Sequence, residues 1–275
     1  MSADVACILF RSNQRQVIPF AEVSDAIEAN SGLVWLELID PDQTTLAKLQ
    51  EELDLHELAV EDALSAHQRP KVEDYAGGLF VVLHTARLWQ NTIEYGETHV
   101  FCGTGYLAII RHGAGPGYRP VQDRLQAFKR ALTPGLALYA LLDHIVDDLR
   151  PLAARLEERH ADLEAALFAN GISSDNLQNL FETKREIQAL MAAVQPMPEI
   201  CGNLIRLHPD IVDKELRAYY RDVEDHAIRM IHDLDRLRPR PLDEIEGLLE
   251  QAQVEGHAVG IGAGHEVAGG LLPQL

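Results

Sequence analysis

Short apolar runs and amphipathic stretches alternate along the first half of the chain. Val34–Ile39 (VWLELI) is rich in β-branched and aromatic residues and predicts a buried strand, closed by the turn-prone Asp40-Pro41-Asp42. In Gln43–Leu53 the leucines recur three and four residues apart, which is the helical period. The same patterns predict strands at Val5–Phe10, Leu79–Leu88, Thr98–Cys102 and Tyr106–Arg111, and helices at Phe20–Ala29 and Arg119–Ala131. The first half therefore predicts a mixed α/β domain.

From Leu138 onward the apolar positions form heptad seams, alternately three and four residues apart. The first seam predicts a helix that ends at Asn170-Gly171, with Pro151 inside it as a kink or a local cost of about 3 kcal/mol. A second helical pattern is interrupted by Pro196 and Pro198. The seams contain Leu138, Leu142, Ile145, Leu149, Leu152 and Leu156; Leu177, Leu180, Ile187, Met191 and Val194; and Tyr220, Val223, Ala227, Met230, Leu234 and Leu237. Three long antiparallel helices after a mixed sheet predict an α+β fold.

The end of the chain follows neither pattern. Pro239 and Pro241 are expected to end the third helix, and a Gly- and Ala-rich stretch with His257 and His265 follows. We expect a flexible end there rather than a metal site. The predicted organisation is an α/β domain over residues 1–133, a long-helix region over residues 134–240 and a tail over residues 241–275.

Composition and charge narrow the class of protein. Hydrophobic residues make up 47% of the 275 residues, enough for a sizeable core, and the net charge of −19 argues against a nucleic-acid partner. Three scattered cysteines without a CxxC pair support neither a disulfide framework nor a zinc site, and favour a reducing, cytoplasmic setting. No signal peptide and no run of about 18 apolar residues occurs, so a soluble chain without transmembrane helices is expected.

Acidic side chains gather in one distinctive stretch, Val60–Tyr75 (VEDALSAHQRPKVEDY). Glu61 and Asp62 form an adjacent pair on a short predicted helix, which we expect Pro70 to stop because proline disfavours helical geometry in the residue before it. Lys71 and a second acidic pair, Glu73-Asp74, follow.

Two more sets of carboxylates lie on the long predicted helices. Asp143 and Asp147 are four residues apart in LLDHIVDD, and Asp222 and His226 are four apart in YYRDVEDHAIRMI. Residues at this spacing share one helix face, where one cation can touch both. Acidic residues on helices are more often simply solvated, so the spacing alone does not establish a metal site.

These segments together resemble the CorA family of magnesium and cobalt transporters. The stretch from Glu61 to Glu73 matches the family's E-D-x-L-x-x-H-Q-R-P-K-V-E segment. Leu141–Asp148 matches L-x-D-x-x-V-D-D, and Tyr219–His226 matches Y-F-R-D-V-x-D-H with Tyr220 in place of Phe. The resemblance covers roughly residues 5–238. It implies the family's cytoplasmic domain, a funnel built from a sheet domain, two hairpin helices and a stalk helix that runs toward the membrane. The family's two membrane helices and Gly-Met-Asn triplet are missing from this sequence.

The resemblance also implies a metal site. It places Asp62 opposite Asp222 across a subunit boundary of a pentamer, as ligands of a regulatory Mg²⁺, or of Co²⁺ or another divalent cation. It assigns Glu61 and Asp143 to a second nearby site, with His67 and His226 as outer contributors. Loss of the ion would loosen the ring and open the pore, a population shift driven by a ligand. The resemblance places the domain on the cytoplasmic side of the inner membrane. The expected partner is therefore a homo-oligomer, and the membrane is reached only through the missing part.

Three hypotheses follow for this chain. The leading one is a CorA-like cytoplasmic domain that binds divalent cations between subunits to regulate gating and does not itself conduct ions. The alternative is a stand-alone soluble metal sensor or interaction protein using the same site. The third is an enzyme, a phosphatase acting through the Arg111-His112-Gly113 triplet at the end of a predicted strand. We expect no enzyme activity, because that triplet is short and the glycines after it more simply form a loop.

Overall fold

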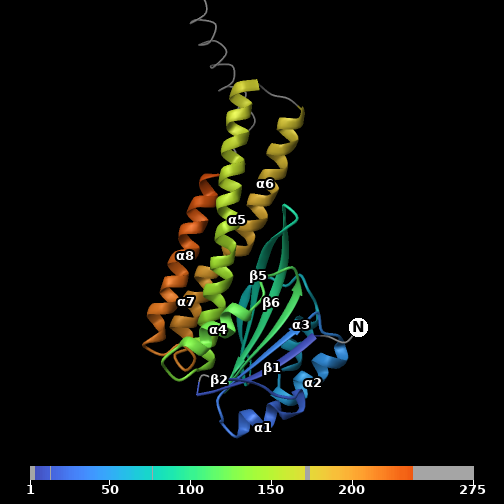
Figure 1. The fold of residues 1–275 in the computed structure, drawn as a ribbon, viewed down its shortest axis with the longest axis vertical. Helices are drawn as coiled ribbons and strands as arrows, with labels where there is room; N and C mark the ends of the chain where they lie inside the picture. The colour runs from blue at the N-terminus through green and yellow to red at the C-terminus, as the bar shows by residue number, and fades with distance from the viewer. Residues whose placement is uncertain (1–3, 13, 76, 171–173, 238–275) are drawn as a thin grey trace, which may run out of the picture.

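The computed structural model describes residues 4–12, 14–75, 77–170 and 174–237. In these ranges one seven-stranded sheet has the order β2-β1-β3-β7-β6-β5-β4 (Figure 1). Only the β3–β7 pair is parallel, which confirms the mixed sheet and the α+β class. The strands are β1 (Asp4–Arg11), β2 (Gln14–Val17), β3 (Leu33–Ile39), β4 (Lys71–Tyr75), β5 (Gly78–Trp89), β6 (Thr92–Gly103) and β7 (Tyr106–Gly113).

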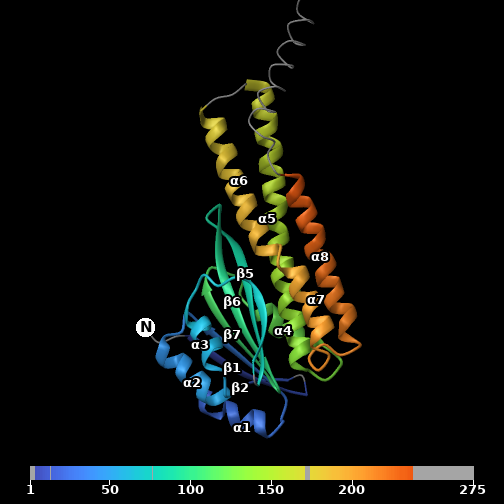
Figure 2. The ribbon, with the colours of Figure 1, turned by 180° about the vertical axis from the view of Figure 1, so that it is seen from behind.

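Helices cover both faces of the sheet. On one face lie a 3-10 turn (Phe20–Glu22), α1 (Val23–Glu28), α2 (Gln43–Leu53) and α3 (Glu57–Leu64); on the other lie α4 (Arg119–Ala127), α5 (Pro134–Asn170), α6 (Ser174–Val194), α7 (Met197–Leu207) and α8 (Leu216–Arg236) (Figure 2). Side chains alternate between the two cores along each strand. In β7, Leu107 and Ile109 face the long helices, whereas Ala108 and Ile110 face α1–α3.

The predicted seams of the long helices are buried. Every described residue of the α5 seam and of the α6 seam is buried, and in α8 only Leu237, just past the helix end, is partly exposed. α5 continues through Pro151, which lies exposed, and is described as far as Asn170. Apolar burial of this kind stabilises a fold by about 1.5–3 kcal/mol for each large side chain. The seams therefore hold the helices to each other and to the sheet.

Some predictions require correction. The interruption expected at Pro196 and Pro198 is present, because α6 ends at Val194, but a further helix, α7, begins directly at Met197. Proline is tolerated in its first turn because the amides there have no helical partner. α4 ends at Ala127 and not at Ala131, because Phe128 adopts an extended backbone. The strands β2 and β4 were not predicted. Both lie at the edges of the sheet, where polar sequences such as QRQV and KVEDY replace apolar ones.

Two expectations concern the chain beyond α8 and the membrane. The tail with Pro239, Pro241, His257 and His265 lies outside the described residues. Among the helices that are described, none has the length and apolar character needed to cross a bilayer.

The first turn of α5 packs closely on the connection between α7 and α8, and one glycine makes this possible. The Tyr220 hydroxyl donates a 2.8 Å hydrogen bond to the Gly135 carbonyl. A Cβ on Gly135 would lie 1.9 Å from the backbone oxygen of Ile211, whereas a Cβ on Gly117 would meet nothing within 4 Å.

We therefore expect Gly135→Ala to lower the free energy of unfolding by about 3 kcal/mol, at the upper end for overpacking because the obstacle is backbone. Gly117→Ala is the matched control and should leave stability within about 0.5 kcal/mol of wild type. Urea denaturation measures both. Equal stability of the two variants would contradict the close approach of Gly135 to the backbone of Ile211.

Candidate metal centre

Three of the five predicted ligands meet between α5 and α8. Asp143 of α5 and Asp222 and His226 of α8 each offer one ligand atom, and these three atoms lie within 4.8 Å of one another. The spacing of four residues on α8 brings His226 Nε2 to 3.8 Å from Asp222 Oδ1. The buried seams of the two helices bring Asp143 to the same place. No other group of this kind is found in the described part of the chain.

Asp143 is the buried member of this cluster. Its side chain is 9% exposed, and its Oδ2 accepts a hydrogen bond from the Arg124 guanidinium of α4. Arg124 also donates to the Tyr139 hydroxyl at 2.5 Å and lies over the Tyr139 ring. Burial acts to lower the pKa of Arg124, but the hydrogen bonds and charge interactions with Asp143 and Tyr139 together outweigh it, and the net shift is upward. The buried carboxylate thus has a permanent cationic partner, as burial of a charge requires.

His226 brings an imidazole nitrogen that lacks a partner. Its Nδ1 is buried and makes no hydrogen bond. The other ring nitrogen, Nε2, is the one that lies near the Asp222 carboxylate, and it can coordinate an ion there. Two carboxylates and an imidazole fit Co²⁺, which accepts nitrogen and oxygen ligands, and the carboxylates fit Mg²⁺, which keeps several waters. The residues present therefore fit a divalent cation.

Glu61 and Asp62 lie elsewhere in the chain. Both are on α3, on the opposite face of the sheet from α5 and α8 (Figure 1). Asp62 Oδ2 lies 2.6 Å from Lys71 Nζ, and the same ammonium lies 2.8 Å from Glu73 Oε2. Burial acts to lower the pKa of Lys71, but the hydrogen bonds and the charges of Asp62 and Glu73 together outweigh it and raise the pKa. A site containing both Asp62 and Asp222 must therefore draw on two copies of the chain.

The segment after α3 corrects one expectation. The helix ends at Leu64, well before Pro70, and Ser65 is already extended. Glu97 of β6 explains the stop: its carboxylate accepts hydrogen bonds from the backbone amides of His67 at 2.6 Å and Gln68 at 3.1 Å, which turns the chain away from the helix. The His67 side chain is 97% exposed and is not part of the Asp143–Asp222–His226 cluster.

Three histidines of the sheet, of which His99 and His112 are buried, contact the same region. His84 Nε2 lies 2.9 Å from the Gln68 carbonyl, and His112 Nε2 lies 2.9 Å from the Ala63 carbonyl. His99 Nε2 lies 3.0 Å from Glu97 Oε2, and burial lowers the pKa of His99. Glu97, despite its burial, has a lowered pKa because His99 and the two backbone amides stabilise its charged form.

The geometry of β7 gives no support to the phosphatase hypothesis. Arg111 and His112 are consecutive in the strand and point to opposite faces of the sheet. Arg111 pairs with Glu37 at 3.0 Å, on the side of the long helices, whereas His112 bonds to α3. The two side chains therefore do not converge on one phosphate.

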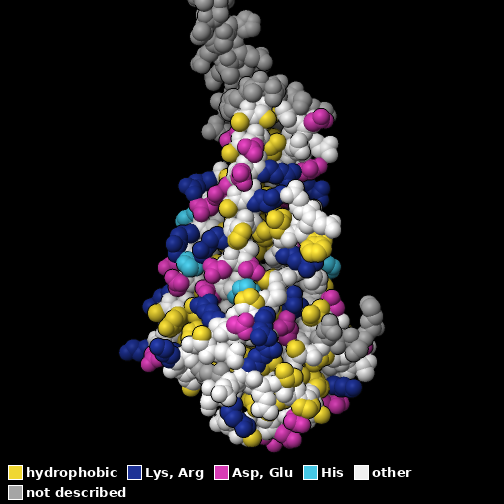
Figure 3. Space-filling model, viewed as in Figure 1, with side chains coloured by type: hydrophobic (Ala, Val, Ile, Leu, Met, Phe, Trp, Pro, Cys, Tyr) yellow, Lys and Arg dark blue, Asp and Glu magenta, His cyan; other side chains and the backbone are white. Residues whose placement is uncertain are grey.

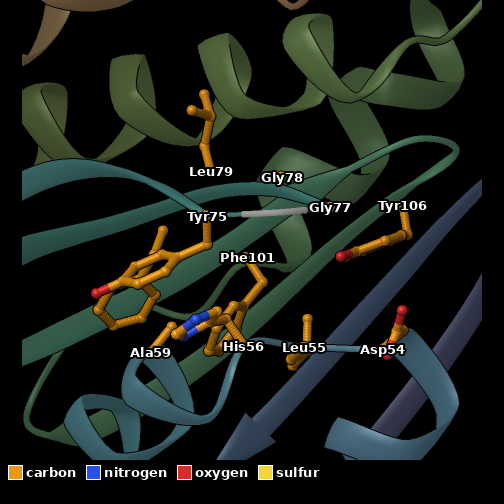
Figure 4. A pocket seen from close by; sticks show the side chains of 11 residues that line it. Asp54, Leu55, His56, Ala59, Tyr75, Gly77, Gly78, Leu79, Phe101 and Tyr106 are labelled. Carbon is orange, nitrogen blue, oxygen red and sulfur yellow. The ribbon is translucent and has the colours of Figure 1, made fainter.

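The cavities differ in size. One of about 430 Å³ lies between α6 and the segment after α3, and His67, His84 and Glu97 are among its lining residues. A second, enclosed by the α2–α3 link, the β4–β5 turn and Tyr106, holds only about 10 Å³, room for a single water (Figure 4). The small one is not a ligand site.

Comparison with known proteins decides the family. Residues 30–255 match the family model described as CorA-like Mg²⁺ transporter protein. The chain belongs to the CorA family. It is 27% identical over 198 residues to the putative metal ion transporter YfjQ of Bacillus subtilis, covering 71% of this chain and 61% of that protein. It is 26% identical over 240 residues to the cobalt/magnesium transport protein CorA of Thermotoga maritima, covering 85% of this chain and 65% of that protein. The chain thus spans less than two thirds of the length of either relative.

The fold agrees with this membership. The soluble domain of CorA from Methanocaldococcus jannaschii superposes with a TM-score of 0.70 at 16% identity, covering 90% of this chain and 95% of that one. At this identity the likeness concerns the fold. The mixed sheet and long helices of this CorA-family chain are those of a CorA soluble domain.

Sequence reasoning missed several residues that pair with the predicted ligands or anchor the segment beside them. Arg124 bonds to Asp143, and Glu97 bonds to the segment after α3. Each lies far from its partner in sequence and belongs to no local pattern. Lys71 stood inside the motif, nine residues after Asp62, and only the unpredicted strand β4 brings it back to that carboxylate.

Glu97→Gln tests the anchor of the post-α3 segment. An amide oxygen accepts these hydrogen bonds less well than a carboxylate, so the variant should lose about 1–3 kcal/mol of unfolding free energy at pH 7. Folding lowers the pKa of Glu97, so its carboxylate stabilises the fold at pH values above the ordinary carboxyl pKa. This contribution to the free energy of unfolding is lost as the pH falls through the lower pKa of the folded protein. The difference between wild type and Glu97→Gln should therefore shrink as the pH falls below the ordinary carboxyl pKa of about 4.3, and vanish below the lower folded value.

Glu94→Gln, in the same strand, is the control. Glu94 pairs with Arg87 in an exposed position, so its replacement should cost at most about 1 kcal/mol. Urea denaturation at several pH values gives both numbers. Equal losses for the two variants at pH 7 would contradict the anchoring role of Glu97.

Proposed function

We propose that this chain is the cation-sensing part of a CorA-type transporter, which binds Mg²⁺ or Co²⁺ between copies of itself. The observation that carries the proposal is the meeting of Asp143, Asp222 and His226, whose ligand atoms lie within 4.8 Å of one another. The relative from Thermotoga maritima, named for cobalt and magnesium transport, supports the same two ions. We assign to the described residues the sensing of the cation, not its passage across a membrane.

The second half of the site comes from a neighbouring copy. Asp62 and Glu61 lie on the face of the sheet opposite Asp222, so a neighbour's α3 can face the α5–α8 cluster in a homo-oligomer, a pentamer if the family resemblance holds. Copies with a net charge of −19 repel each other, and carboxylates that face each other across an interface add to this. A divalent ion between them replaces repulsion with a bridge.

Regulation follows from linkage. An ion that binds only the assembled state stabilises that state, by about 2.7 kcal/mol when its concentration is a hundred times Kd. As the cation concentration falls, the population shifts toward the looser state. In a transporter this shift would open the pore and give negative feedback on uptake. The alternative hypothesis, a stand-alone metal sensor, uses the same site and therefore predicts the same binding of the cation.

The main test measures mass and thermal unfolding of the chain with and without millimolar Mg²⁺ or Co²⁺. Wild type should melt at a higher temperature and assemble further with either ion. Asp222→Asn should abolish both responses, because it removes a ligand charge. Asp162→Asn carries the same charge change at an exposed position further along α5, and should respond as wild type does. A wild-type protein whose mass and melting ignore both ions would refute the proposal.

His226→Gln separates the two ions. Imidazole is a good ligand for Co²⁺ and a poor one for Mg²⁺, so the variant should lose affinity for Co²⁺ about tenfold or more and for Mg²⁺ much less. His232→Gln, exposed on the same helix, is the matched control. Isothermal titration with each ion measures the effect. An equal loss for both ions would mean that His226 does not coordinate the metal.

A further inference from the structure

Two of the four carboxylates predicted to bind the cation already have a cationic side chain of the same chain beside them. Lys71 pairs with Asp62, and Arg124 pairs with Asp143. On the face seen in Figure 3, acidic and basic side chains are likewise interspersed over the helices and do not gather into separate patches. Asp62 and Asp143 are therefore not free anions waiting for a metal.

The Lys71 contact is closely defined. Its ammonium lies 2.6 Å from Asp62 Oδ2 and 2.8 Å from Glu73 Oε2, and 5.8 Å from the centre of the Phe80 ring. The Lys71 and Asp62 side chains are only 26% and 31% exposed, so water screens the pair less than it screens a fully exposed one. The strand β4 fixes the lysine backbone, because Lys71 pairs with Val82 of β5.

We propose that Lys71 is a built-in counter-ion that sets the cation concentration to which the site responds. This inference rests on the proposed function. A divalent ion that binds Asp62 must share or displace the ammonium at Oδ2, and the displaced Lys71 remains paired with Glu73. Competition with Lys71 lowers the affinity of Asp62 for the metal. When the metal leaves, Lys71 neutralises Asp62 again, so the chain folds both with and without the metal.

Arg124 is likewise the counter-ion of Asp143, and more contacts fix its position. The guanidinium is bound to the Tyr139 hydroxyl and lies over that ring, as well as over Phe128 at 5.9 Å. Asp143 is also more buried than Asp62. Removing Arg124 would leave a buried carboxylate without compensation and endanger folding. Lys71 is therefore the residue to test.

The experiment is isothermal titration of Mg²⁺ and Co²⁺ into the full chain. Lys71→Met keeps the stem and removes the charge, and should bind both ions about two- to tenfold more tightly than wild type. Lys71→Arg keeps the charge and should bind as wild type does. Lys48→Met removes a charge from an exposed position of α2 and controls for the change in net charge.

The outcomes separate this inference from the proposed function. Tighter binding by Lys71→Met alone supports the counter-ion role, even if wild type binds too weakly to measure. Binding by wild type that Lys71→Met leaves unchanged or weakens overturns the counter-ion role and leaves the site intact. Equal tightening in Lys71→Met and Lys48→Met also overturns it, as an effect of net charge. Absence of binding in every variant refutes the site and the counter-ion together.

Discussion

The burial of the α5 seam is the contact on which the rest of the structure depends. Leu138, Leu142 and Ile145 are almost fully inaccessible, and they pack within a single core that includes the sheet, α4 and α6–α8. This packing fixes α8 beside α5 and thereby sets where Asp222 and His226 lie. The position of Asp143, one residue after Leu142, follows from the same contact. The candidate site is thus a product of hydrophobic packing, with its polar atoms added along the seam.

Buried acids impose the second constraint, because a carboxylate removed from water needs donors or a cation. The chain meets this need in two ways. Glu97 receives two backbone amides and His99, which ties the post-α3 segment to the sheet. Asp143 receives Arg124, a side chain that carries its own charge. The first solution is structural, whereas the second leaves a charge balance that another cation can alter.

Sequence alone predicted the parts of this structure that are encoded locally. The heptad seams and the boundaries of Gln43–Leu53 were correct, because apolar periodicity is visible within a few residues. The spacing of Asp222 and His226 was a local signal too. Edge strands such as β4 lacked an apolar pattern, and α7 was hidden because Pro198 looks like a break but sits in a first turn. Arg124 and Glu97 could not be predicted, since only tertiary packing brings them to their partners.

The two halves of the proposed site lie on opposite faces of the sheet, and this placement would restrict how copies can associate. A two-fold dimer pairs identical patches, whereas here the α3 face of one copy would have to meet the α5–α8 face of the next. Such a head-to-tail contact leaves one half-site unused at each end of an open assembly. Only a closed ring uses them all, and it then holds one shared site per copy. The stoichiometry of bound cation would therefore report directly on ring closure.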